Sequence, residues 1–174
     1  MGELSIIAQL IAGWLLVDLI GGLFHWFEDR MGSPDWPILG RHVIGPNRQH
    51  HLQPLAFTRS GFISRNWTTW MAVAVIVAPL LAIFGTSVWL IAATLGGLMS
   101  NQVHYWAHLP SRAPASVRVL QDLGVMQSSR QHQLHHAPPH DRRYCVLTDW
   151  LNPLLDRLQV WSRLERMMPQ RWLA

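Results

Sequence analysis

The amino-acid sequence predicts an all-α integral membrane protein, with about three transmembrane helices and shorter interfacial helices that form a histidine-rich cap on the cytoplasmic side. Its 174 residues are 49% hydrophobic and only 14% charged, roughly half the charged fraction of an average soluble domain. Residues 66–111 contain no Asp, Glu, Lys or Arg. The length fits one domain, so we expect residues 1–174 to form a single membrane-embedded unit.

Three apolar stretches are the expected spans. Residues 4–24 form the first, and it is about long enough to cross a ~30 Å hydrocarbon layer. It has no basic region before it and no small-residue cleavage site, so we expect it to be retained rather than removed as a signal peptide. Residues 68–84 and 87–105, separated by Gly85 and Thr86, are predicted to form a helical hairpin.

The arginines predict the orientation of these spans. Five lie in residues 30–65 and nine in residues 112–171, and the chain has no Lys. In a model with three spans both blocks fall on one side, which the bias of basic residues makes cytoplasmic. We therefore expect the inner membrane of a bacterium, with the cap in the cytoplasm. A pI of about 10.5 would permit nucleic-acid binding, but arginines beside membrane spans fit anionic lipid headgroups better, so we expect no nucleic-acid partner.

Two segments are predicted to lie in the membrane interface. Residues 154–168 place leucines, Trp161 and Met168 on one helical face and three arginines on the other. Residues 116–126 have a looser pattern of the same kind. The single cysteine, Cys145, excludes an internal disulfide and a zinc cluster built on cysteines.

The histidines carry the chemical signal of the sequence. All ten fall on the expected cytoplasmic side, and several stand one helical turn apart, the spacing at which two side chains of one helix reach the same ion. The candidate metal ligands are His25, Asp29, His50, His51, His104, His108, His132, His135, His136 and His140. Because these exceed the three or four ligands of a single ion, we predict two metal ions.

The ligand chemistry leaves several functions open. Nitrogen-rich sites suit iron, zinc or copper, and imidazoles with a carboxylate suit ferrous iron that activates dioxygen. An acyl or alkyl chain entering between the spans would then be the substrate. Zinc would instead favour hydrolysis. A non-enzymatic haem or metal carrier is an alternative from another class, although haem ligands would be expected inside the spans.

Several motifs resemble, in the same order, those of the Kua family of membrane lipid desaturases. Asp18 and residues 22–33 (Gly-Leu-Phe-His-Trp-Phe-Glu-Asp-Arg-Met-Gly-Ser) resemble the first, and residues 47–54 (Asn-Arg-Gln-His-His-Leu-Gln-Pro) the second. Residues 100–108 (Ser-Asn-Gln-Val-His-Tyr-Trp-Ala-His) and 130–136 (Arg-Gln-His-Gln-Leu-His-His) resemble the next two. The resemblance covers about residues 18–152. Ser60 departs from it, because some members have a histidine there.

The resemblance implies an oxygen-dependent desaturase with two iron ions, dioxygen as co-substrate and a membrane phospholipid as substrate. The chain shows no haem or flavin signature, so electrons would come from a separate protein such as a ferredoxin or cytochrome b5. The family contains plasmanylethanolamine desaturase and a plant plastid phosphatidylglycerol desaturase. Pro54 and His140 look more like the animal-type members, which favours formation of the plasmanylethanolamine vinyl ether; desaturation of a phospholipid acyl chain is the alternative.

Two polar residues inside the spans are further candidates for the catalytic site. Asp18 lies two helical turns before His25, and a carboxylate within a span is costly and usually functional. We expect it to hold the ring of a ligand such as His25 or His108; the alternative is a buried hydrogen bond between helices. Asn101 is open to the same two interpretations.

Overall fold

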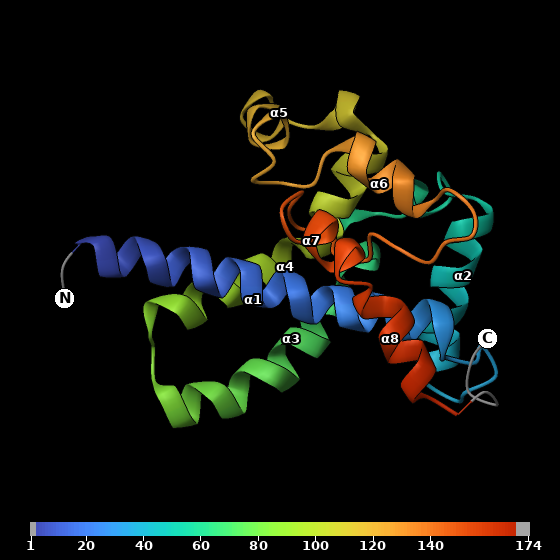
Figure 1. The fold of residues 1–174 in the computed structure, drawn as a ribbon, viewed down its shortest axis with the longest axis horizontal. Helices are drawn as coiled ribbons and strands as arrows, with labels where there is room; N and C mark the ends of the chain where they lie inside the picture. Colours follow the sequence, from blue (N-terminus) through green and yellow to red (C-terminus); the bar gives the residue numbers. More distant parts are fainter. Residues whose placement is uncertain (1–2, 170–174) are drawn as a thin grey trace.

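The computed structural model describes residues 3–169, and every regular element among them is helical (Figure 1). The three longest helices are α1 (Glu3–Arg30), α3 (Phe62–Phe84) and α4 (Val88–His108). The shorter helices are η1 (Gly40–Ile44), α2 (Gly45–Leu52), η2 (Phe57–Arg59), η3 (Pro110–Arg112), α5 (Ala115–Asp122), α6 (Ser129–His135), α7 (Leu151–Arg157) and α8 (Val160–Met167). The all-helical prediction is confirmed.

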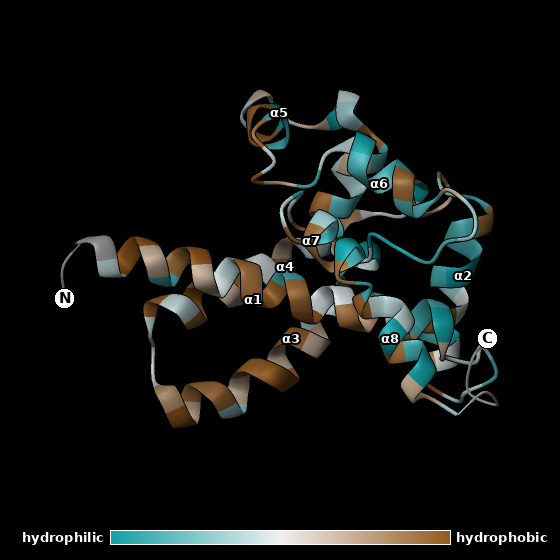
Figure 2. Ribbon diagram, in the orientation of Figure 1, coloured by the Kyte–Doolittle hydropathy of each residue, from teal (hydrophilic) through white to brown (hydrophobic). Residues whose placement is uncertain are grey.

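The long helices extend from one side of the molecule and the short helices gather at the other (Figure 1). α4 packs along both α1 and α3, whereas α1 and α3 diverge from each other. Figure 2 shows that the projecting parts of the long helices are hydrophobic, while α2 and α6 are largely hydrophilic. This division is typical of a membrane region with a polar cap.

Two of the three expected spans are long and apolar enough to cross a membrane: residues Ser5–Arg30 and Phe62–Phe84. The third expected span corresponds to α4, which is 21 residues long. It is not among the helices that are apolar enough over their length to cross a membrane. Its first half is apolar, and its second half carries Asn101, Gln102, His104 and His108. The same helix therefore serves the apolar region and the cap.

Glycines allow α4 to approach its two neighbours closely. A Cβ atom at Gly13 of α1 would collide with the backbone of Trp89 in α4. A Cβ at Gly97 would lie 2.8 Å from the side chain of Val73 in α3. Small residues at helix contacts are common in membrane proteins because they permit dense packing of the backbones.

The cap is joined to α1 by a buried carboxylate. Asp18, which is 1% exposed, accepts hydrogen bonds from the backbone N–H groups of Leu147 and Thr148 at 2.8 and 3.1 Å and from the Thr148 hydroxyl at 2.7 Å. Beside it, Gly22 faces Cys145, which is fully buried with Tyr144 in the core of the cap. These contacts fix the loop after α6 against α1.

The two expected interfacial segments differ from the prediction in detail. Residues 154–168 do not form one helix, because Gln159 adopts a left-handed conformation with φ 52° and separates α7 from α8. The apolar residues of this segment are also divided. Trp161 is buried in the cap, whereas Leu154 and Leu158 remain exposed. Residues 116–126 correspond to the short helix α5 and the turn that follows it.

Candidate metal centre

Nine of the ten candidate ligands fall into two neighbouring groups. The histidine group consists of His50, His104, His108, His132 and His136, and the mixed group consists of His25, Asp29, His51 and His135. Within each group the potential ligand atoms all lie within 4.8 Å of one another. The groups adjoin, since the ring centroids of His25 and His104 are 6.1 Å apart. The residues therefore fit two ion sites.

In the histidine group the Nε2 atoms point at a common centre. His50 Nε2 lies 3.1 Å from His104 Nε2 and 3.0 Å from His108 Nε2, and His132 Nε2 lies 2.7 Å from His108 Nε2 and 3.0 Å from His136 Nε2. A metal–imidazole bond is about 2.0–2.1 Å, as for zinc, so two nitrogens at right angles on one ion are about 3 Å apart. The observed spacing fits nitrogens that share one ion.

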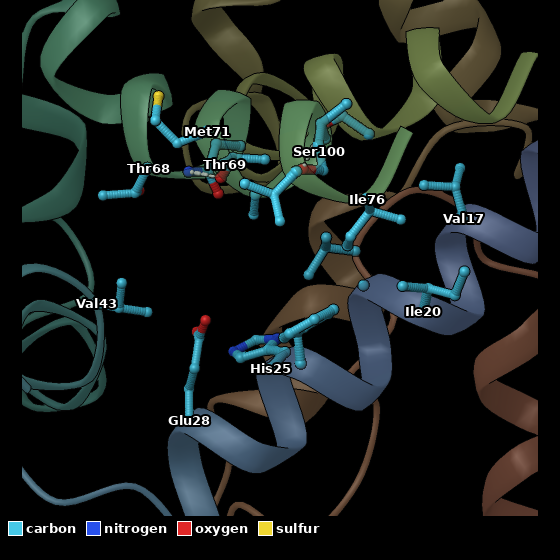
Figure 3. Close-up of a pocket in the computed structure, with 18 of the residues that line it drawn as sticks. Val17, Ile20, His25, Glu28, Val43, Thr68, Thr69, Met71, Ile76 and Ser100 are labelled. Carbon is cyan, nitrogen blue, oxygen red and sulfur yellow. Dashed lines mark hydrogen bonds between the residues drawn. The ribbon is translucent and has the colours of Figure 1, made fainter. Parts of the chain in front are cut away.

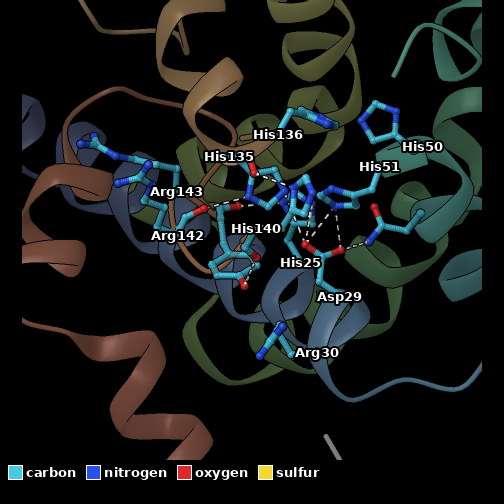
Figure 4. A network of polar contacts seen from close by, with 12 residues as sticks. His25, Asp29, Arg30, His50, His51, His135, His136, His140, Arg142 and Arg143 are labelled. Carbon is cyan, nitrogen blue, oxygen red and sulfur yellow. Dashed lines mark hydrogen bonds and ion pairs between the residues drawn. The ribbon is translucent and has the colours of Figure 1, made fainter. Parts of the chain in front are cut away.

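The mixed group is centred on the Asp29 carboxylate. Figure 4 shows His25, His51 and His135 converging on it. Their Nε2 atoms lie 3.7, 3.1 and 3.4 Å from Asp29 Oδ2. The other carboxylate oxygen accepts a hydrogen bond from the Asn47 amide.

Two backbone carbonyls set the orientation of rings in the mixed group. His25 Nδ1 lies 3.0 Å from the carbonyl oxygen of Tyr144, and His135 Nδ1 lies 2.8 Å from that of Arg142. When Nδ1–H donates to a carbonyl, Nε2 is left as the unprotonated atom that can bind a metal. The Nε2 atoms of His25 and His135 are buried and have no hydrogen-bond partner in the described part of the chain. Buried polar atoms without a partner are costly, and a bound cation would satisfy them.

Burial favours the neutral form of four imidazoles of the cap, those of His50, His132, His135 and His136. It lowers the pKa of His50 to about 2 and that of His136 to about 3, and neighbouring imidazoles add to the effect. For the same reasons the pKa values of His132 and His135 lie well below the ordinary value. Neutral imidazole is the form that coordinates a metal, so the electrostatics fit the geometry.

Local helix geometry explains how the ligands are divided. The pairs His25/Asp29, His104/His108 and His132/His136 are each four residues apart, and each pair stays within one group, as the spacing predicts. The adjacent residues His50 and His51 fall into different groups, and so do His135 and His136. Successive side chains of an α-helix point about 100° apart. A His-His doublet can therefore serve two ions.

A cavity of about 640 Å³ leads from the apolar helices to the two groups. It lies between α1, α3 and α4, and Val17, Ile20 and Ile76 are among the apolar residues in its wall (Figure 3). His25 and His104 also line it, so each group contributes one residue to the wall. An extended hydrocarbon chain fits such a lining.

Three other candidates have different surroundings from those expected. Asp18 lines the cavity, but its carboxylate contacts the backbone at residues 147–148 and holds no histidine ring. The Asn101 amide donates to the Arg65 carbonyl and to the Thr69 hydroxyl, both at 2.8 Å, and so joins α4 to α3. His140 lies outside both groups, with its Nδ1 3.3 Å from the His135 carbonyl oxygen.

The hydrogen bonds of Asp18 and of Asn101 in the described structure thus go to partners other than a ligand ring. Asn101 makes the hydrogen bond between helices that was the alternative, whereas Asp18 bonds to a loop rather than to a second helix. Sequence analysis also missed Glu28, which lines the cavity, and Asn47, whose amide reaches Asp29. Both lie within the motifs already quoted, but the sequence does not show which way their side chains point.

The matching family model and three relatives of this chain all carry the name of a desaturase. A family model described as a lipid desaturase domain matches residues 14–172. Plasmanylethanolamine desaturase 1 of Mus musculus is 34% identical over 178 residues, which cover 94% of this chain and 65% of the relative. Plasmanylethanolamine desaturase of Myxococcus xanthus is 30% identical, covering 96% and 62%. The chloroplastic fatty acid desaturase 4 of Arabidopsis thaliana is 34% identical, covering 88% and 49%.

The chain thus spans less than two thirds of the length of these three relatives. No solved structure matches it. The family match extends over nearly the whole chain and includes all residues of both metal-ligand groups. The chain belongs to the lipid desaturase family.

Proposed function

We propose that this protein is an oxygen-dependent di-iron desaturase that introduces a carbon–carbon double bond into the chain of a membrane phospholipid. The observation that carries the proposal is that the apolar cavity is lined by His25 of one ligand group and His104 of the other. A methylene pair in this cavity would lie beside both metal positions. Family membership supplies the reaction class.

The candidate ligands divide between two iron ions as the two groups do. The histidine group would hold one ion with five imidazoles, and the mixed group would hold the other with three imidazoles and Asp29. Two iron ions so held would supply the redox chemistry by which dioxygen is reduced and hydrogen is removed from a lipid chain. Iron is favoured over zinc because the reaction of this family is a redox reaction.

In this proposal the protein's own residues bind the hydrocarbon chain and orient the candidate metal ligands. The walls contributed by α1, α3 and α4 hold the hydrocarbon chain and exclude water from the site. The carbonyls of Tyr144 and Arg142 keep the Nε2 atoms of His25 and His135 aimed at the mixed group. Asp18 and Asn101 fix the helices and the loop that carry these residues, so both are positioning residues in this proposal.

The first candidate substrate is plasmanylethanolamine, with the new bond being the vinyl ether of its alkyl chain. Two relatives bear the name plasmanylethanolamine desaturase. A second candidate is the acyl chain of a phospholipid such as phosphatidylglycerol, which is favoured by the similarity to the chloroplastic fatty acid desaturase.

A separate electron donor such as a ferredoxin or cytochrome b5 is part of the proposal. We place the cap, and with it the side on which the donor docks, in the cytoplasm. The support is the distribution of arginines, which flank the apolar stretches and are absent from residues 66–111.

Lipid mass spectrometry of a bacterial host that expresses the chain tests the proposal. With oxygen, we expect new vinyl ether lipids when ether lipids are supplied, and these should be absent without oxygen and with the His104→Ala variant. New unsaturated acyl chains would instead identify the second candidate. Metal analysis of the purified protein should find iron. Zinc without iron, a haem absorption band, or an unchanged lipid profile in oxygen would contradict the proposal.

A further inference from the structure

Glu28 is a carboxylate in the cavity wall that belongs to neither ligand group. It follows His25 by three residues on α1, so the two side chains lie on the same face of the helix. Figure 3 shows both of them pointing into the cavity, with Val43 and Thr68 on the other side. Glu28 is thus placed to contact whatever fills the cavity near the candidate metal centre.

Within the described residues, the carboxylate of Glu28 makes no hydrogen bond and no ion pair. The other cavity carboxylate, Asp18, is saturated by three donors. A carboxylate removed from bulk water is costly unless it is paired or hydrogen-bonded. A cationic group in the cavity would be a partner that stabilises the ionised form of Glu28.

The charges of the wall indicate the chemistry of that partner. The protein has 14 arginines, yet neither Arg nor Lys occurs among the described residues that line the cavity. An anionic group beside Glu28 would meet a like charge and find no guanidinium. A positively charged ammonium would find a carboxylate, and charge-assisted hydrogen bonds are stronger than hydrogen bonds between neutral groups.

The two ends of the cavity differ in polarity. Glu28, His42, Asn47 and Thr68 line the part near the cap, whereas Leu16, Ile76, Leu80 and Trp89 line the part among the apolar helices. A phospholipid entering from the membrane would lie with its hydrocarbon chain along the apolar part. Its polar headgroup would then be at the end where Glu28 stands.

We propose that Glu28 is a specificity-determining residue that binds the ammonium of a lipid headgroup and disfavours lipids whose headgroup is anionic. The assignment deepens the proposed function, and its reaction step rests on that function. The binding preference itself can be measured without any turnover.

Tryptophans in the cavity wall provide the binding assay. The purified protein in a neutral maltoside detergent is titrated with phosphatidylethanolamine or phosphatidylglycerol that carries bromine in its acyl chains, which quenches tryptophan fluorescence on contact. Trp67 and Trp89 line the cavity, and the difference from a Trp89→Phe variant isolates the cavity signal. We expect the ethanolamine lipid to bind at least about tenfold more tightly, the range of a hydrogen bond to a charged group.

The Glu28→Gln variant keeps the shape of the side chain and removes its charge. We expect it to lose most of that preference through weaker binding of the ethanolamine lipid. Glu28→Asp keeps the charge with a shorter reach and should retain part of the preference, and it also serves if the Gln variant does not fold. Asp35→Asn removes an exposed carboxylate outside the cavity wall and should leave the preference unchanged.

Two outcomes would overturn the assignment: equal binding of the two lipids by the unmodified protein, or an unchanged preference in Glu28→Gln. Lipid desaturation measured in parallel separates this result from the proposed function. Preferential binding without any double-bond formation would leave the role of Glu28 standing and remove the proposed reaction. Desaturation of both lipids at the same ratio in the unmodified protein and in Glu28→Gln would do the opposite.

Discussion

His50 and His51 are neighbours in the chain, yet they belong to different ligand groups. Removing either one would therefore deprive a different one of the two proposed ions of a ligand. We expect His50→Ala and His51→Ala each to lower the bound iron, with two distinguishable spectroscopic changes because the remaining sites differ in their ligands. His42→Ala, outside both groups, should retain its full metal content. Metal analysis with Mössbauer spectroscopy of the three variants makes the comparison, and identical spectra for the first two would refute the division.

The low pKa values of His50 and His136 predict a loss of stability in acid. Burial lowers the pKa of His50 to about 2 and that of His136 to about 3, so the folded protein leaves both rings neutral where the unfolded chain protonates them. At pH values between the low pKa of the folded protein and the ordinary histidine pKa of the unfolded chain, the unfolded state binds more protons. Stability therefore rises with pH over this interval. The stabilisation is fully present above about pH 6.5 and is lost as the pH falls below it.

Thermal unfolding of the metal-free protein in detergent checks this direction. We expect the unfolding temperature to fall steadily from pH 7.5 to pH 5, since protons bind the unfolded chain preferentially over that interval. The double variant His50→Gln/His136→Gln should show a weaker dependence on pH. A dependence of the opposite sign would mean that these rings are charged in the folded protein.

At the scale of the helices, the contact between α1 and α4 depends on a glycine. At Gly13 an added methyl group would meet the backbone of Trp89, whereas at Gly21 on the same helix it would meet nothing within 4 Å. Gly13→Ala should therefore destabilise the fold by about 1–3 kcal/mol, while Gly21→Ala should stabilise it by about 0.5–1 kcal/mol through the better helix propensity of alanine. Denaturation in mixed micelles measures both, and equal effects would contradict the close contact.

The cavity between the helices predicts a limit on the lipid chain. Ala93 on α4 lines the cavity, and Ile91 on the same helix is exposed and does not. Ala93→Phe should lower the desaturation of long chains several-fold while short chains are converted nearly as before, because the larger ring shortens the space available. Ile91→Phe should change neither. Product analysis with a series of chain lengths tests this, and a uniform loss for all lengths would indicate a general folding defect.

The helices were predictable to different extents. The apolar runs identify α1 and α3, because hydrophobic length is a direct requirement of a bilayer. α4 combines an apolar half with a ligand-bearing half, so its average composition conceals its packing between α1 and α3. The break between α7 and α8 at Gln159 was not predictable, since a left-handed residue other than glycine leaves little trace in a sequence.

For the whole molecule, the clustering of the candidate ligands was predictable from the sequence, whereas the groups that hold them in place were not. Helical spacing pairs His25 with Asp29 and His104 with His108, and the structure keeps these pairs together. The partners of Asp18, Asn101 and the two oriented histidines are backbone groups or hydroxyls. Every residue has the same backbone, so a sequence pattern cannot show which carbonyl or N–H will be near.

Each ligand group draws on segments far apart in the chain: the mixed group joins residues 25 and 29 to residues 51 and 135. During biosynthesis the ribosome adds His132–His136 last among these ligands, after the long apolar helices have already been made. Neither site is complete until that point, and a nascent chain released earlier would carry no finished redox centre. The long apolar helices are therefore synthesised before either ligand group can be completed.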